Sequence, residues 1–279
     1  MASKYEIRSI SLPPRSHPTT LSLEEKLNKL KTWEASSTSS SESICIGLSG
    51  LEDLCVGVNH LLNMSSTQEV ISHYPNEKCL DNLLDGSVRI LDICGIARDV
   101  MLQFKEQVQA LQSALRRRKG NSSIESSIAS YSCFTNKMKK EAKKSIAVLK
   151  QMDCKLKSSP VQDHHLIQLI KEVVAINSSV FQSLFLFLST SKPKQSRWSM
   201  VSKLMHKGAQ ACEEKQETVN QLESVDAALS ERPHFEKMQI AQRRLEALEI
   251  SIQDIENFLE SVFKHLIKTR ATILNIISQ

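Results

Sequence analysis

Hydrophobic residues recur along most of this chain at gaps of three and four positions, the spacing that gathers them on one face of an α-helix. The most regular run extends from Met238 to Ile276, and its seven-residue repeat predicts a rod-like helix with a coiled-coil-like seam. The seam consists of Leu245, Leu248, Ile252, Ile255, Leu259, Val262, Leu266 and Ile273. Because an isolated helix cannot keep such a stripe in water, other helices must cover it. The long helices available in the chain favour cover from within and therefore a monomer, with a homodimer seam as the alternative.

Three more long runs have the same spacing, from Leu80 to Leu115, from Ile124 to Leu156 and from Leu166 to Leu188. A run from Ile44 to Leu61 precedes a break near Pro75, and a shorter helix or helix pair is expected between Trp198 and Leu229. Short connections make successive helices antiparallel neighbours. The pattern predicts an all-α fold, an elongated bundle of long antiparallel helices with a short N-terminal helix.

The first part of the chain differs from the rest. Residues 1–20 contain three prolines among Ser, Arg and His, and predict an irregular basic tail. Residues 21–42 predict a short helix, begun by a capping box of Ser22 and Glu25, and a flexible Ser-rich linker. Residues 43–279 predict a single helical-bundle domain, in which Ile273, Leu274, Ile276 and Ile277 are expected to be buried.

Composition agrees with long helices, because Gly and Pro, which turns require, occur only seven times each in 279 residues. The N-terminus has no apolar signal segment, and the most apolar stretch, Val180 to Leu188, is far shorter than the roughly 20 residues of a membrane span. We therefore expect a cytoplasmic protein, with peripheral membrane association left open. Seven scattered cysteines without a Cys-x-x-Cys pair predict buried, reduced thiols.

Signatures of catalysis are missing from the sequence: it has no Gly-rich phosphate loop, no His-Glu-x-x-His and no Gly-x-Ser-x-Gly. The adjacent His164 and His165 point to different faces of a helix and cannot share one metal ion. The sequence predicts a protein that is not an enzyme and that needs no cofactor or metal.

Charge is unevenly distributed, with 13 Lys or Arg against 4 Asp or Glu in residues 105–157, and 5 against 12 in residues 209–260. The two blocks could neutralise each other on adjacent helices, or the basic block could bind an acidic protein or an anionic membrane surface. The candidate patch is Arg116, Arg117, Arg118, Lys119, Lys137, Lys139, Lys140, Lys143 and Lys144. Nucleic acid is a weaker alternative, because no recognition motif is present and aromatic content is 5%. Ser11, three residues after Arg8, is a candidate phosphorylation site.

Five blocks of the sequence, in order, resemble a known family. They are YEIRSISLPPRSHPTTLSLEEKLNKLKTWE, VQALQSALRRRKG, KMKKEAKKSIAVLKQMD, RWSMVSKLMHKG and LEISIQDIENFLESVFKHLIKTRATILNIISQ. Together they resemble the plant BYPASS-related proteins, a plant domain of unknown function. The resemblance implies a helical land-plant protein without established catalytic residues, and links to root and shoot development in some relatives. The function predicted is a non-enzymatic interaction or regulatory protein with an unidentified protein partner.

Overall fold

The structure, a computed structural model, describes residues 17–117, 121–157, 164–189, 220–229 and 235–278. Regular structure within these ranges is helical, without strands, which confirms the predicted all-α fold. The helices are α1 (Pro18–Ser36), α2 (Ser41–Leu62), α3 (Ser65–Ser72), α4 (Glu77–Arg117), α5 (Asn121–Lys157), α6 (His165–Ser189), α8 (Gln221–Leu229) and α9 (Phe235–Ile277).

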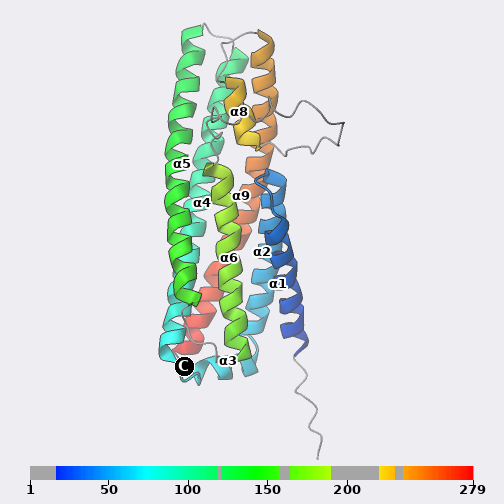
Figure 1. Cartoon of the computed structure of the whole chain (residues 1–279), viewed down its shortest axis with the longest axis vertical. Helices are drawn as coiled ribbons and strands as arrows, with labels where there is room; N and C mark the ends of the chain where they lie inside the picture. Colours follow the sequence, from blue (N-terminus) through cyan, green and yellow to red (C-terminus); the bar gives the residue numbers. More distant parts are fainter. Residues whose placement is uncertain (1–16, 118–120, 158–163, 190–219, 230–234, 279) are drawn as a thin grey trace, which may run out of the picture.

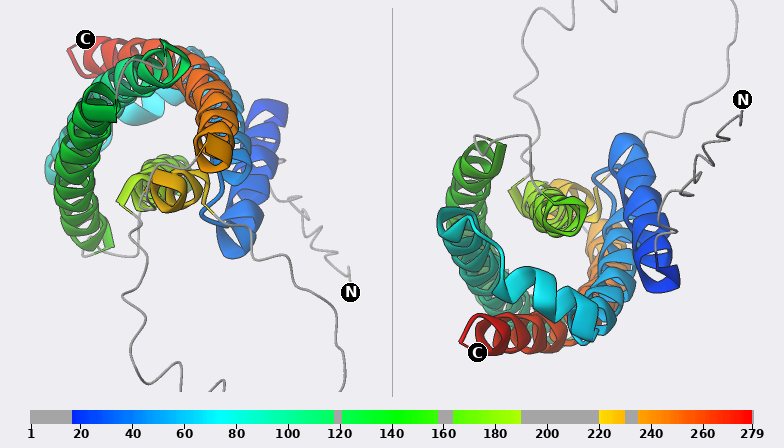
Figure 2. Two further views of the ribbon diagram at one scale, coloured as in Figure 1. Left: turned by 90° about the horizontal axis from the view of Figure 1, so that it is seen from above. Right: turned by 90° about the horizontal axis from the view of Figure 1, so that it is seen from below.

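Five helices lie side by side in a curved layer, in the order α5, α4, α9, α2, α1 (Figures 1 and 2). On the concave side, α6 packs against α5, α4, α2 and α1, while α8 packs against the N-terminal half of α9. Successive long helices are antiparallel, as predicted. Helices α2 and α9, which are not successive, run parallel: Ser41 near the start of α2 contacts Ser251, and Asn59 near its end contacts Thr269, further along α9. In the part of the chain that the structure describes, the outer, convex face of the layer is formed by these five helices.

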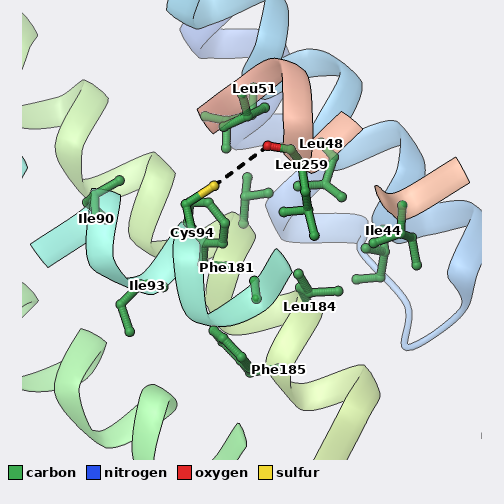
Figure 3. Close-up of a cluster of buried hydrophobic side chains, with 14 of the residues drawn as sticks. Ile44, Leu48, Leu51, Ile90, Ile93, Cys94, Phe181, Leu184, Phe185 and Leu259 are labelled. Atoms are coloured by element: carbon green, nitrogen blue, oxygen red, sulfur yellow. Dashed lines mark hydrogen bonds between the residues drawn. The ribbon is translucent and has the colours of Figure 1, made fainter. Parts of the chain in front are cut away.

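The predicted seam of α9 is covered within the chain by α2 and α4. Six of its residues, from Leu245 to Val262, are fully buried, Ile273 is buried and Leu266 is partly buried. Figure 3 shows a part of the core in which Leu48 of α2, Cys94 of α4, Phe181 of α6 and Leu259 of α9 lie together, and the Cys94 thiol donates to the Leu259 carbonyl at 3.8 Å. This seam is thus not a free surface for a second chain.

The start of the chain is more ordered than the sequence indicated. Helix α1 begins at Pro18 with His17 as its cap, whose Nδ1 accepts from the Thr19 amide at 3.2 Å, so the predicted Ser22–Glu25 capping box is wrong. Proline suits the first helical turn, where its missing N–H needs no partner. The linker is also short, only Ser37 to Ser40, and Ser40 caps α2 by accepting from the Ser43 amide at 3.2 Å.

Glycines on α2 let α1 approach closely. A Cβ on Gly47 would lie 2.3 Å from the Trp33 ring, and one on Gly50 would lie 2.8 Å from Leu30. The Trp33 indole N–H donates to the Ser43 carbonyl at 2.9 Å, which fixes the ring over Gly47. The N-terminal helix is therefore an integral part of the bundle.

Several finer predictions need correction. Helix α3 was not predicted, because eight residues are too few for a recognisable period. Ile273 and Ile276 are buried as expected, but Leu274 and Ile277 are 41% and 37% exposed, since the end of α9 has neighbours on one side only. The segment from Trp198 to Val219 lies outside the described residues.

The thiols do not all behave as predicted. Cys55, Cys79 and Cys94 are buried and Cys45 is half-buried, whereas two cysteines, Cys133 and Cys154, are exposed on α5. Burial raises the pKa of the Cys45 thiol to about 11 and that of the Cys55 and Cys94 thiols to about 12. Cys212 lies outside the described residues.

By length and composition, α2 and α6 could each cross a membrane, which the sequence prediction did not anticipate because it considered only uninterrupted apolar runs. In both helices 56% of the most apolar window is buried inside the bundle. Core helices of water-soluble bundles pass the same test, so the apolar character of α2 and α6 has an explanation in packing.

Candidate interaction surface

The outer face of α5 carries the central part of the predicted basic patch. Lys137, Lys140, Lys143 and Lys144 are exposed there, and every exposed charged residue of α5 between Ser132 and Lys155 is a lysine. Asp153 lies on the side of α5 that faces α6, because its carboxylate accepts a hydrogen bond from Gln182 of α6 at 2.8 Å. The lysines therefore point away from the core.

The structure separates other members of the patch from these four. Lys139 is only 14% exposed and forms an ion pair with Asp226 of α8 at 2.9 Å. Arg116 pairs with Glu246 of α9 at 3.1 Å, and Arg117 donates to the Ser113 carbonyl of its own helix. Arg118 and Lys119 lie outside the described residues, as does Ser11. The nine predicted residues thus do not form one continuous surface.

Opposite charges meet along the contact between α4 and α9. Arg98 pairs with Glu260, Lys105 with Glu256 at 2.8 Å, and Arg116 with Glu246. Hydrogen bonds from neighbouring side chains lower the pKa of Glu246, chiefly from Gln242 and Arg116, and of Glu260, chiefly from Lys264. The prediction that the basic and acidic blocks neutralise each other is confirmed for Lys105, Arg116 and Lys139, and these pairs fix the register of the helices more than they stabilise them.

A stripe of acidic residues on α4 runs beside the lysines of α5, and the sequence analysis missed it. It consists of Asp85, Asp92, Asp99 and Glu106, all exposed and spaced by seven residues. A step of seven returns to nearly the same side of a helix, with an offset of about 20°. On the opposite side of α4, Gly86 faces Val174 of α6. The seven-residue spacing was a signal that could have revealed this stripe.

A groove of about 480 Å³ lies between α4 and α5, and Asp85, Asp92 and Lys144 of the two stripes line it, whereas Asp99 lines a separate pocket between α4 and α9. Asp92 of α4 and Lys144 of α5 stand on its opposite walls, and Val88, Ile93, Ile96 and Val148 provide apolar lining. Lys144 pairs with Glu141 of its own helix at 3.2 Å, while Asp92 has no ion-pair partner among the described residues. The hydroxyl of Ser145, also in the lining, is buried without a hydrogen-bond partner in the described part of the chain.

This arrangement places the acidic stripe of α4 beside the exposed lysines of α5, with apolar side chains between them, and Arg89 of α4 and Glu141 of α5 add one charge of the other sign to each wall of the groove. We call it the two-charge face, defined by Asp85, Asp92, Asp99 and Glu106 of α4, by Lys137, Lys140 and Lys144 of α5, and by the groove between them. Within the described residues no group of three or more His, Cys, Asp or Glu side chains is placed to hold a metal ion. The charged side chains of the two-charge face suit the recognition of another charged surface.

The family model described as Protein BPS1 matches residues 47–276, which include α3 to α9 and most of α2. This chain belongs to the BPS1 family. The match confirms the resemblance to the plant BYPASS-related proteins and includes the whole two-charge face of this BPS1-family protein, while α1 lies outside it. No curated protein and no solved structure matches the chain.

Proposed function

We propose that this protein is a non-enzymatic interaction protein acting in plant root and shoot development, and that it docks a protein partner on its two-charge face. Membership of the BPS1 family supports the link to plant development. The observation that carries the docking proposal is the pair of exposed stripes, acidic on α4 and basic on α5. Opposite charges arranged side by side give specificity, because only a partner with the complementary arrangement avoids like-charge contacts.

Peripheral attachment to an anionic membrane is the second candidate, and the exposed lysines of α5 are the observation in its favour. Each lysine near an anionic surface contributes about 1 kcal/mol of attraction. The acidic stripe lies on the same outer face and opposes that attraction, which favours a protein partner. Flotation with vesicles rich in phosphatidylserine at low salt separates the two candidates. We expect no flotation, whereas flotation that disappears in a Lys140→Glu/Lys144→Glu variant would support the membrane.

Rescue of plants that lack the protein tests the proposed function. A Lys137→Glu/Lys144→Glu variant reverses two of the three lysines of the two-charge face without touching the core, so its melting temperature should stay close to that of the natural protein. We expect the variant to accumulate but to fail to restore root and shoot growth. A control variant, Lys268→Glu, changes an exposed lysine of α9 away from the face and should restore growth. Full rescue by the folded double variant would show that the face is not needed.

A further inference from the structure

We propose that the partner of the two-charge face is a second copy of this chain, paired through a two-fold axis that runs along the groove. The inference rests on the proposed function, because it names the partner of the same surface. The α9 seam, the dimer surface expected from the sequence, is already covered by α2 and α4. A dimer therefore needs another self-complementary surface.

The two stripes stand level with each other along the bundle. Ser130 of α5 donates to Gln107 of α4 at 3.4 Å, and Asp92 and Lys144 line the same groove. Because α4 and α5 are antiparallel, Asp99 and Lys137 each lie one heptad from that pair, toward the same end of the bundle. Two acidic residues of the stripe, Asp92 and Asp99, thus each have a lysine near their own level on α5, whereas Glu106 lies level with Ser130, where α5 has no lysine.

Rotation by 180° about an axis along the groove exchanges the two walls without changing the level of any residue. In that arrangement Asp92 of one copy faces Lys144 of the other, and Asp99 faces Lys137, and each contact occurs twice. A two-fold axis across the groove would instead place acid against acid and lysine against lysine. The charge pattern consequently selects a dimer in which the two bundles are parallel.

Apolar side chains lie next to the axis. Val148, in the groove, is 39% exposed, and Val88 and Ile96, also in the groove, are partly buried. The acidic stripe spans 21 residues, or about 32 Å of helix. With two helices about 10 Å wide each, the face offers about 600 Å² per copy, which reaches the lower limit of specific protein interfaces. Such a dimer is weak and salt-sensitive.

Light scattering coupled to size exclusion measures the mass of the full chain. At about 20 mM salt, where the screening length is roughly 20 Å, we expect a mass near twice 31.4 kDa, and at about 1 M salt a shift toward one chain. The Asp92→Lys/Asp99→Lys and Lys137→Glu/Lys144→Glu variants each place like charges opposite each other at the two paired levels, so both should run as single chains. An equimolar mixture of the two should recover the two-chain mass, because each wall then faces its opposite.

A Glu34→Lys/Lys268→Glu variant, with exposed changes on α1 and α9, is the matched control and should keep the natural mass. A single-chain mass of the natural protein at low salt would overturn the proposal, as would a mixture that stays monomeric or variants that remain dimers. The proposed function is tested separately. Loss of plant rescue by the lysine variant, together with a natural protein that is always a single chain, would show that the face docks a different protein.

Discussion

Replacing Gly47 by Ala tests the close packing of α1 against α2. The new Cβ would lie 2.3, 2.7 and 2.8 Å from three atoms of the Trp33 ring, distances that real side chains do not adopt. The ring is rigid and held by its hydrogen bond to the Ser43 carbonyl, so it must leave its site. Overpacking of this kind costs about 1–3 kcal/mol and the lost hydrogen bond about 1 kcal/mol, against a gain of about 1 kcal/mol in helix propensity. We expect a net loss of about 1–3 kcal/mol.

Gly95 of α4 provides the matched control, because a Cβ there meets nothing within 4 Å. Gly95→Ala should raise stability by up to about 1 kcal/mol through helix propensity alone. Urea unfolding followed by helical circular dichroism measures both variants, and protease cleavage within α1 reports whether that helix detaches first. A Gly47→Ala protein as stable as the natural one, with α1 equally protected, would refute the packing described here.

Three further outcomes follow from burial and charge. Ile252→Ala should lower the free energy of unfolding by about 2–5 kcal/mol, since Ile252 is fully buried, whereas Ile250→Ala, at a 66% exposed position, should change it by less than about 0.5 kcal/mol; equal effects would contradict the seam. A thiol reagent should label the two exposed cysteines of α5 in the folded protein and the buried ones only after unfolding; mass mapping that finds rapid labelling of the buried thiols would contradict the fold. The hydrogen bond from Lys31 lowers the pKa of Glu172, so this pair adds stability, about 0–1 kcal/mol, that is present above the ordinary carboxyl pKa of 4.5 and is lost as pH falls through the lower folded value. Melting of Glu172→Gln should therefore fall below that of the natural protein at neutral pH and converge with it in acid, and a constant difference would exclude this origin.

The long helices could be predicted from the sequence because each buries one face over many turns. The run from Met238 to Ile276 is an example, because eleven of its twelve periodic positions are apolar and the single polar one, Thr269, does not hide the pattern. The short α3 and the start of α1 could not, since they depend on single contacts such as the His17 cap. Helix ends are set by local hydrogen bonds, which composition does not report.

Half of the two-charge face was also predictable. Lys137, Lys140 and Lys144 stand close together in the sequence and were recognised as a patch. Asp92 and Asp99 are seven residues apart and are diluted among apolar and basic neighbours, so they did not stand out as a cluster. That α4 and α5 place these two stripes on one outer face, with a groove between them, follows only from tertiary packing.

The claim that the two-charge face carries the function can be tested most directly by exchanging its charges. A quadruple variant, Asp92→Lys/Asp99→Lys/Lys137→Glu/Lys144→Glu, keeps opposite charges at the two paired levels and exchanges which helix carries which sign. If the face binds a second copy, this variant should form dimers and restore root and shoot growth in plants that lack the protein. A variant that forms dimers but fails to restore growth would contradict the account, because the function would then need a different partner that recognises the natural order of charges.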